Sequence, residues 1–390
     1  MKIAPIDREF RRRGIETLLV HTGQHYDQNM SDVFFEDLNM KSPDVHLNVG
    51  SGSHATQTAK IMMEFEKVCD EHDFSMVVVV GDVNSTIACT LVAKKLGILV
   101  THVEAGLRSF DREMPEEINR ILTDSISDLL LTPSLDGNEN LQNEGVSNTR
   151  VEFVGNIMID SLYDALERVR EMDINPAKSL DLERYSVVTL HRPSNVDSEE
   201  MVNQLVEHLV EISKKIAVVF PMHPRTRNNL RKFGKLPILE AEPSIFVLDP
   251  LGYLEFVSLV GGSTLVITDS GGLQEETTSL SIPCLTLREN TERPITITEG
   301  TNKLITDLSI LQSSIDEALT SESIQNKQKP KYWDGRTAER IVNAIIACIV
   351  IGFIKKTNRL TIKDLLECLS VGAKNTLAVG AAAASIGIIV

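Results

Sequence analysis

Short apolar runs alternate with longer amphipathic stretches up to about residue 330, and this rhythm restricts the fold more than any other feature of the sequence. In the first half of the chain the apolar runs are residues 17–21 (TLLVH), 76–81 (MVVVVG), 99–103 (LVTHV) and 128–132 (DLLLT). Each is rich in Val, Ile or Leu and ends in a polar or glycine-containing turn, as buried parallel strands do. The intervening segments 53–70 and 83–96 have helical spacing. The first half is therefore predicted to be an α/β domain.

The same rhythm returns in the second half of the chain. Its apolar runs are residues 185–190 (YSVVTL), 216–221 (IAVVFP), 245–248 (IFVL), 265–268 (LVIT) and 283–287 (PCLTL). Two series of β-α-β units predict two doubly wound sheets. The acidic stretch 171–184 is predicted to lead into the second domain, with a hinge just before it at residues 155–160.

Composition excludes several classes of function. Of the 390 residues, 42% are hydrophobic and 24% are charged, which is typical of a soluble globular protein. The net charge of -16 argues against nucleic acid or an anionic membrane surface as the main partner. An anionic substrate would therefore need a local positive site.

The five cysteines lie far apart, without a CxxC pair and without histidines at metal-ligand spacing. This pattern predicts neither a zinc site nor a disulfide framework. The start MKIAPIDREFRRRG has no apolar signal core, so secretion is not expected. We expect a cytoplasmic protein.

Ligands of open α/β sheets bind outside the carboxyl ends of the strands, and polar residues are found at those positions. Asp82 follows MVVVVG, and Glu104 follows LVTHV. Asp82 alone is as well explained as a cap of the next helix. A Glu buried at a strand end is costly unless it is paired or used.

A third carboxylate comes from the next helix, which is predicted to start at Pro115. This start places Glu116 and Arg120 four residues apart on one face, where a plain surface ion pair is the simplest interpretation. Three carboxylates at neighbouring positions of one sheet are harder to dismiss. Because like charges close together raise at least one pKa, the set indicates proton transfer.

The second half supplies candidate groups for an anion. His191 follows a strand in TLHRPSNVD, and His223 follows one in FPMHPR. A single histidine is more often structural than functional, but two at equivalent strand ends favour a functional site.

The strongest local signal is ITDSGGLQEET at residues 267–277, where a strand runs into Ser270, Gly271 and Gly272 and a helix follows. Glycines allow the backbone to approach a phosphate, and the helix N-terminus presents free N–H groups. Glu276, one turn into that helix, is placed to accept hydrogen bonds from ribose hydroxyls. Neither a GxGxxG fingerprint nor a Walker lysine is found here, so a diphosphate sugar nucleotide fits better than ATP or NAD.

Several motifs together resemble those of the non-hydrolysing UDP-N-acetylglucosamine 2-epimerases. They are TGQHYD (22–27), VFFEDL (33–38), GDVNST (81–86), HVEAGLRSFDREMPEEINR (102–120), LHRPSNVD (190–197), TDSGGLQEE (268–276) and TERP (291–294). The resemblance covers residues 1 to about 346, in order and at the family's spacing.

The resemblance implies a GT-B fold, in which two Rossmann-like domains enclose a cleft. The implied domains are an N-terminal domain at residues 1–158, a UDP-binding domain at 159–330 and a helix at 331–346 that packs back on the first domain.

The implied activity is reversible C2 epimerisation of UDP-N-acetylglucosamine to UDP-N-acetylmannosamine, through elimination and re-addition of UDP. The family's catalytic positions correspond to Asp82, Glu104, Glu116 and His191. Its substrate-binding positions correspond to Lys2, Arg120, His223, Ser270, Gly271, Gly272, Glu276 and Arg293. No metal and no cofactor is implied, and a homodimer is expected.

Two parts of the sequence depart from the family. The family begins with an apolar strand followed by Gly-Thr-Arg-Pro-Glu, whereas this sequence begins at the lysine that comes next, Lys2. We therefore expect the N-terminal domain to lack its first strand. Residues 347–390 are instead similar to part of the large permease of a tripartite periplasmic transporter, and we expect a foreign tail. Its first apolar run, 341–354, is shorter than the roughly 20 residues that span a bilayer.

Other functions stay open on the sequence alone. A hydrolysing 2-epimerase shares the fold and most motifs but releases free N-acetylmannosamine and UDP. A GT-B glycosyltransferase would use the same glycine turn without needing the three carboxylates together. An inactive UDP-sugar-binding remnant is the non-enzymatic alternative.

Overall fold

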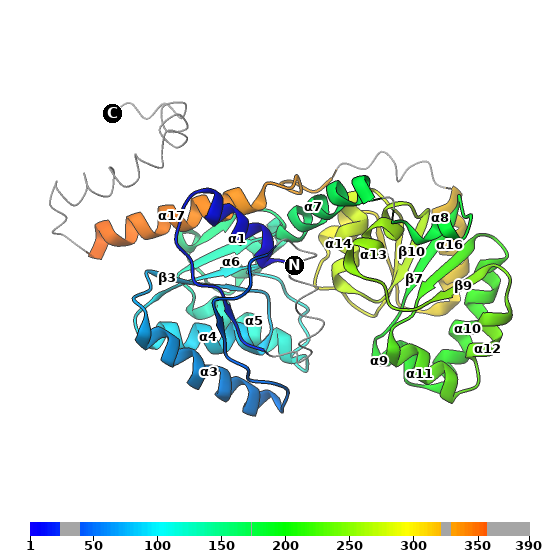
Figure 1. Ribbon diagram of the computed structural model, residues 1–390, viewed down its shortest axis with the longest axis horizontal. Helices are drawn as coiled ribbons and strands as arrows, with labels where there is room; N and C mark the ends of the chain where they lie inside the picture. Colours follow the sequence, from blue (N-terminus) through cyan, green and yellow to red (C-terminus); the bar gives the residue numbers. More distant parts are fainter. Residues whose placement is uncertain (24–39, 173, 321–328, 357–390) are drawn as a thin grey trace.

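The computed structural model describes residues 1–23, 40–172, 174–320 and 329–356. They form two α/β halves that lie side by side, joined by α7 (Ile157–Met172). The last helix, α17 (Thr337–Lys356), runs along the N-terminal half (Figure 1).

The N-terminal strands are parallel and fall into two hydrogen-bonded groups. One contains β1 (Val20–His21) and β2 (Val45–His46). The other has the order β3-β4-β5-β6, with β3 (Met76–Val80), β4 (Leu99–Val103), β5 (Leu129–Thr132) and β6 (Val151–Phe153). Within the described residues β1 and β3 are not paired, so the N-terminal half is not one continuous sheet. The absence of a first strand stays a prediction.

Besides α7 and α17, the described helices of this half lie around the strands. They are α1 (Ile3–Arg12), α3 (His54–Glu71), α4 (Asn84–Lys95), α5 (Pro115–Ile126) and α6 (Leu135–Asn143). The predicted starts have local causes. The Ser53 hydroxyl accepts a hydrogen bond from the Thr56 N–H, 3.2 Å away, and so caps α3. Pro115 begins α5, where its missing N–H costs no hydrogen bond.

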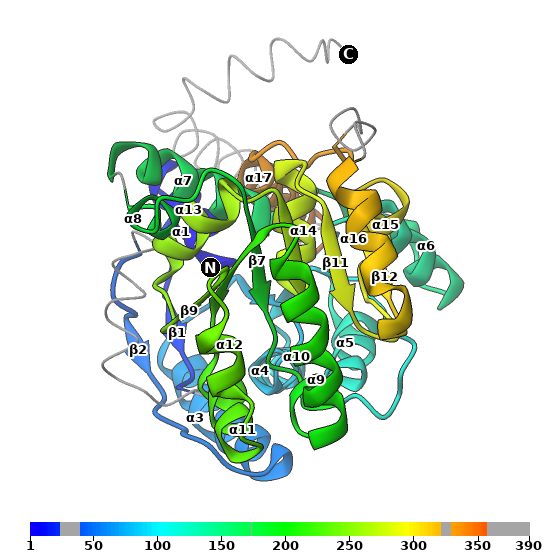
Figure 2. The same cartoon turned by 90° about the vertical axis from the view of Figure 1, so that its right-hand side faces the viewer.

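The C-terminal half contains one six-stranded parallel sheet of order β12-β11-β10-β7-β8-β9. Its strands are β7 (Tyr185–Thr189), β8 (Ala217–Pro221), β9 (Ile245–Leu248), β10 (Leu265–Thr268), β11 (Cys284–Leu287) and β12 (Asn302–Ile305). The helices are α8 (Pro176–Ser179), α9 (Pro193–Val196), α10 (Glu199–Ser213), α11 (Pro224–Lys232), α12 (Leu236–Ala241), α13 (Tyr253–Gly261), α14 (Gly271–Leu280), α15 (Ile295–Thr298) and α16 (Leu311–Thr320). Figure 2 shows α10 and α16 over one face of this sheet.

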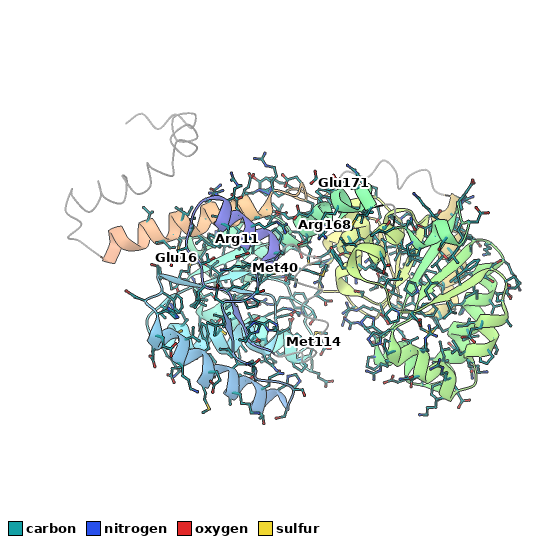
Figure 3. All side chains as sticks on the ribbon, viewed as in Figure 1. Arg11, Glu16, Met40, Met114, Arg168 and Glu171 are labelled. Atoms are coloured by element: carbon teal, nitrogen blue, oxygen red, sulfur yellow. The ribbon has the colours of Figure 1, made fainter. Side chains whose placement is uncertain are left out.

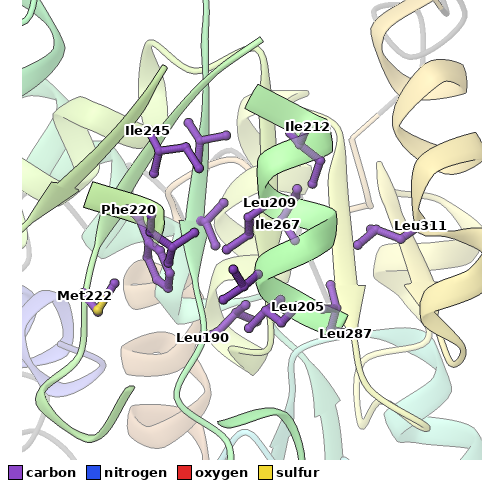
Figure 4. Packing of buried hydrophobic residues seen from close by; sticks show 14 of the residues in the cluster. Leu190, Leu205, Leu209, Ile212, Phe220, Met222, Ile245, Ile267, Leu287 and Leu311 are labelled. Carbon is purple, nitrogen blue, oxygen red and sulfur yellow. The ribbon is translucent and has the colours of Figure 1, made fainter. Parts of the chain in front are cut away.

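The apolar face of α10 supplies much of the core in this half. Leu205, Leu209 and Ile212 are almost completely buried and belong to the same cluster as Phe220 and Ile267 of the sheet (Figure 4). Burying such side chains away from water is the main contribution to the stability of this helix–sheet packing. Each fully buried side chain contributes about 1.5–3 kcal/mol. The strand ends that carry the candidate site are therefore held on a packed scaffold.

Helix α7 packs against both halves, with α1 and α17 on one side and α13 and α14 on the other. Its Ile159 and Leu162 are buried with Val257 and Trp333. Asp160, also on α7, accepts hydrogen bonds from the backbone N–H of residues 337 and 338 at the start of α17, at 3.1 and 2.8 Å. The first turn of α7 thus occupies most of the predicted hinge.

Residues 347–356, the start of the predicted foreign tail, continue the closing helix. Ile6 and Phe10 of α1 share a buried cluster with Ile341 and Ile345 of α17. The helix continues without a break past Ile346 to Lys356. Residues 357–390, which hold most of the proposed permease-like tail, lie outside the described part, and that resemblance stays a prediction. None of the described helices combines the length and apolar character that a membrane crossing requires.

Candidate active site

The turn after β3 holds an ion pair between two of the predicted site residues. The Asp82 carboxylate accepts hydrogen bonds from Arg120 Nε and Nη2, at 2.9 and 2.7 Å. The third nitrogen of the guanidinium, Nη1, donates to Glu117 Oε2 at 2.7 Å. The predicted pairing of Arg120 with Glu116 is therefore wrong.

Glu117, rather than Glu116, pairs with Arg120 because the Glu117 carboxylate points inward to a strained loop. It accepts hydrogen bonds from the Ser109 N–H and hydroxyl, at 2.9 and 3.1 Å, and from the Phe110 N–H at 3.0 Å. Phe110 has a φ of 60° and an exposed fraction of 78%. Left-handed backbone is unfavourable for a bulky residue, so Glu117 holds this loop in place. Figure 3 shows nearby Met114 on the side of the N-terminal half that faces the C-terminal half.

The turn after β4 holds a second ion pair. Glu104 is buried, has a φ of 70° and pairs through Oε2 with Lys2 Nζ. Its other oxygen, Oε1, is buried with no hydrogen-bond partner among the described residues. A Cβ at Gly81 would lie 3.4 Å from Lys2 Nζ and 3.6 Å from Glu104 Oε2, which are ordinary contact distances, so this turn lies directly against the pair. The φ of 75° at Gly81 is what favours a glycine there. The structure thus brings the predicted residues Lys2 and Glu104 together.

Glu116 lies in the first turn of α5 and is half-buried. Within the described residues its carboxylate forms no hydrogen bond or ion pair. The structure therefore does not bring Glu116 into contact with the other two carboxylates. As far as the described residues go, that carboxylate is available to a ligand.

The second half contributes an Asp–His pair at the ends of β7 and β10. Asp269 Oδ1 lies 2.9 Å from His191 Nδ1. Burial alone would raise the pKa of Asp269, but hydrogen bonds from His191 and Asn195 and from the Arg192 backbone lower it instead. With Nδ1 directed to a carboxylate, the Nε2 edge of His191 remains for a ligand.

His223 lies beside His191, with the ring centroids 5.7 Å apart. Its Nδ1 accepts a hydrogen bond from the Arg225 N–H at 3.1 Å, which leaves Nε2 as the donor of a neutral ring. Burial, together with the charges of His191 and Arg225, lowers the pKa of His223. The two predicted histidines do meet.

The glycine turn opens α14, with Ser270 at the N-cap position and no side chain capping the first turn. A Cβ at Gly271 would lie 2.8 Å from Arg293 Nη1, whereas a Cβ at Gly272 would meet nothing within 4 Å. The turn therefore presents backbone N–H groups beside open space on one side and an arginine on the other. This arrangement suits an anion.

A chain of buried charges connects the two halves. Arg293 Nε lies 3.0 Å from Glu275 Oε1, and that oxygen accepts a hydrogen bond from Asn156 Nδ2 at 2.9 Å. Burial raises the pKa of Glu275, and the nearby Glu104 charge raises it further while Arg293 and Lys2 oppose the change. Glu104 and Lys2 of the first half are thus close enough to Glu275 and Arg293 of the second to affect their charge.

Sequence reasoning missed several members of these networks. They are Glu117, Asp269, Glu275, Arg288 and Glu292, of which Arg288 pairs with Glu292 at 2.9 Å. Asp269 had a usable signal, since it directly follows a strand. Among the described residues, no group of three or more His, Cys, Asp or Glu side chains is arranged to hold a metal ion.

Comparison with known proteins identifies the class of site. The family model described as UDP-N-acetylglucosamine 2-epimerase matches residues 8–346. A UDP-N-acetylglucosamine 2-epimerase of Methanococcus maripaludis is 42% identical over 352 residues, which cover 88% of this chain and 94% of the relative. A UDP-2,3-diacetamido-2,3-dideoxy-D-glucuronate 2-epimerase of Pseudomonas aeruginosa is also 42% identical, over 75% of this chain and 80% of the relative.

A solved structure extends the likeness to the whole fold. The crystal structure of Methanocaldococcus jannaschii UDP-GlcNAc 2-epimerase, in complex with UDP-GlcNAc and UDP, superposes with a TM-score of 0.80 at 40% identity. The superposition covers 89% of this chain and 96% of that one. The two α/β halves with their parallel strands are therefore those of a GT-B fold. The chain belongs to the UDP-N-acetylglucosamine 2-epimerase family.

Glu276 generates a prediction about pH. Burial and then the neighbouring Glu275 raise the pKa of Glu276 from 4.5 to about 8. Between these values the folded chain keeps a proton that the unfolded chain releases, so the free energy of unfolding falls as pH rises through this window.

Replacing Glu276 by Gln should remove this contribution. In urea unfolding of the ligand-free protein between pH 5 and about pH 8, the wild-type stability should fall more steeply than that of Glu276→Gln. The difference between the two proteins cancels the other titrating groups. Parallel pH profiles would contradict the raised pKa of Glu276.

Proposed function

We propose that this chain inverts C2 of UDP-N-acetylglucosamine reversibly, giving UDP-N-acetylmannosamine, by eliminating UDP and adding it back. One observation carries the proposal. The Glu104–Lys2 pair of the first half acts electrostatically on the Glu275–Arg293 pair of the second, beside the glycine turn. Acid/base groups and an anion site therefore border the same region.

The proposed reaction needs both the acid/base groups and the anion site. The C2 proton of the sugar is not acidic, so direct inversion is difficult. In the proposed first step a base removes this proton, the C1–O bond to UDP breaks with its electron pair on the diphosphate, and a 2-acetamidoglucal forms. Reversal with the proton delivered to the other face of C2 inverts that centre. Carboxylates near C2 and C3 and charge neutralisation at the diphosphate serve these two needs.

Each proposed role fits the surroundings of its residue. Within the described part of the chain, Glu104 has a buried oxygen without a hydrogen-bond partner and the half-buried Glu116 carboxylate forms no hydrogen bond or ion pair, so these two are assigned to proton transfer. Asp82 is held by Arg120, whose role is therefore to position that carboxylate. His191, backed by Asp269, is assigned to the departing diphosphate.

The nucleotide is assigned to the second half. The backbone N–H groups at Gly271 and Gly272 receive the diphosphate, with Ser270, His223 and Arg293 beside them. The Ser270 N–H itself donates to Thr268 Oγ1 at 3.0 Å, so Ser270 is assigned to binding through its hydroxyl. Glu276 receives the ribose hydroxyls. Those donors would favour its charged form, so binding at neutral pH should release a proton.

A second substrate has specific support. The Pseudomonas aeruginosa relative, 42% identical, acts by its name on UDP-2,3-diacetamido-2,3-dideoxy-D-glucuronate. That sugar has a carboxylate where N-acetylglucosamine has a hydroxymethyl group, and an extra acetamido group at C3. Comparing kcat/KM for the two nucleotide sugars decides between them, and we expect UDP-N-acetylglucosamine to be preferred.

Assembly and location belong to the same proposal. We infer a homodimer, for which exposed Ile118 and Leu122, one turn apart on α5, supply apolar surface. We also infer a cytoplasmic location, because the cysteines at 69, 89, 284 and 348 are free thiols, which a reducing compartment maintains.

Loss of the assigned carboxylates should stop turnover without stopping binding. Glu104→Gln and Glu116→Gln should each lower kcat by about 10²–10⁴, measured by proton NMR of UDP-N-acetylglucosamine and UDP-N-acetylmannosamine. The affinity for UDP, measured by calorimetry, should change little. Near-normal epimerisation in both variants would overturn the assignment. Free N-acetylmannosamine in the wild-type reaction would instead favour a hydrolysing enzyme.

A side chain at the glycine turn should block the diphosphate. Gly272→Val points into open space, so UDP affinity should fall at least about 100-fold while the melting temperature stays near that of the wild type. Gly261→Ala is a matched control, since its nearest neighbour beyond the helix backbone would be a leucine methyl at 3.6 Å. Unchanged UDP binding by Gly272→Val would place the diphosphate elsewhere.

A further inference from the structure

His102 is a completely buried histidine in β4, two residues before Glu104. Its Nδ1 lies 2.6 Å from Asp124 Oδ1, and its Nε2 lies 2.9 Å from the Gly81 carbonyl oxygen. A peptide carbonyl can only accept a hydrogen bond, and an ionised carboxylate likewise only accepts. Both ring nitrogens must therefore carry hydrogen if Asp124 is ionised.

The surroundings of Asp124 favour its ionised form. Its second oxygen, Oδ2, accepts a hydrogen bond from the Gly106 N–H at 3.0 Å and pairs with Arg108 Nη1 at 2.8 Å. Burial opposes ionisation, yet the charges of His102 and Arg108 and the bond from Gly106 lower the pKa of Asp124 overall. If Asp124 were protonated and His102 neutral, Asp124 would lose its attraction to the His102 imidazolium and to the Arg108 guanidinium.

The charges of this cluster are paired from the interior out to the surface. Arg108 also forms two hydrogen bonds with Glu144, both at 2.7 Å, and the Glu144 side chain is exposed. Inside, the His102 imidazolium and Arg108 thus face Asp124, and Arg108 meets Glu144 at the surface. Paired and hydrogen-bonded charges are the kind that a protein interior tolerates.

The hydrogen bonds of this cluster join the three segments that carry the carboxylates of the site. Gly81 immediately precedes Asp82, and Gly106 follows Glu104 by two residues. Asp124 lies on α5, the helix that also bears Glu116 and Arg120. One imidazole ring and its carboxylate therefore fix the backbone at the ends of β3 and β4 relative to α5.

Backbone conformation at these points depends on such bonds. Gly81 has a φ of 75°, Glu104 of 70° and Gly106 of 81°. Positive φ at a glutamate is unfavourable, and surrounding interactions must hold it there. In sequence, these hydrogen bonds flank Glu104: His102, two residues before it, bonds to the Gly81 carbonyl, and the Gly106 N–H, two residues after it, bonds to Asp124.

We propose that His102, protonated on both ring nitrogens, is a positioning residue that sets the relative placement of Asp82, Glu104 and Glu116. It does not touch the substrate. The proposal rests on the proposed epimerase function. Its effect on turnover should be large, because a displacement of about 1 Å in a reacting group can cost 10²-fold in rate.

The first test reads the ring directly and needs no activity. In nitrogen-15 NMR of the wild-type protein at neutral pH, the His102 ring should show hydrogen bound to both nitrogens, assigned by its loss in His102→Phe or, if that variant does not fold, in His102→Gln. One unprotonated ring nitrogen would overturn the proposal.

The second test separates positioning from folding. His102→Asn keeps a donor near the Nδ1 position, His102→Gln keeps one near Nε2, and His102→Phe keeps neither. For variants that bind UDP within about twofold of the wild type, kcat should fall by about 10² or more in His102→Phe and less in the amide variants. Exposed His72→Asn is the matched control and should leave kcat unchanged.

The outcomes distinguish this proposal from the function on which it rests. Normal kcat in every folded His102 variant, with an active wild type, would overturn the positioning role and leave the epimerase function intact. A wild type without epimerase activity would overturn the function, and the NMR measurement would then decide the ring protonation alone.

Discussion

Ion pairs in which at least one member is buried fix how the parts of this molecule meet. Glu104 pairs with Lys2, Asp82 with Arg120, Glu275 with Arg293 and Asp124 with Arg108. A buried charge without a partner is strongly unfavourable, so each pair requires its two elements to keep their places. Lys2 lies just before α1, and Arg293 lies just before α15 in the second half. Moving either element away would leave a carboxylate unpaired within the site.

The same constraint explains why the site can be chemically active. Glu104 and Glu275 each have a cationic partner, yet Glu104 Oε1 and Glu275 Oε2 remain without hydrogen-bond partners among the described residues. A ligand that brings donors to these oxygens would therefore gain from groups that the protein leaves unsatisfied. The helix N-terminus at Gly271 offers the complementary set of free donors.

Most of the strands were predictable from the sequence, and the strands that were not predicted share one physical property. Every strand predicted from a short apolar run was found, with bounds that mostly agree to within a residue, because strands buried on both faces need continuous apolar residues. The missed strands β2, β6 and β12 all lie at sheet edges. Edge strands are only partly buried, so Val45–His46 and Asn302–Ile305 carry no continuous apolar run.

The site was partly predictable, since strand ends indicated Asp82, Glu104, His191 and the glycine turn. Neighbouring glutamates on helices were harder. Glu116 and Glu117, like Glu275 and Glu276, are adjacent and chemically identical, and the sequence does not fix which of them turns toward an arginine. That choice depends on tertiary partners, such as the Ser109 and Phe110 backbone for Glu117 and Arg293 for Glu275.

The central claim is that paired carboxylates remove and return the C2 proton while UDP leaves and comes back. Running the reaction in D₂O tests this most directly. The account predicts that UDP-N-acetylmannosamine formed from UDP-N-acetylglucosamine carries one deuterium at C2, and that the recovered substrate gains deuterium there as the reaction reverses. Epimerised product that keeps its original C2 hydrogen throughout would contradict the account.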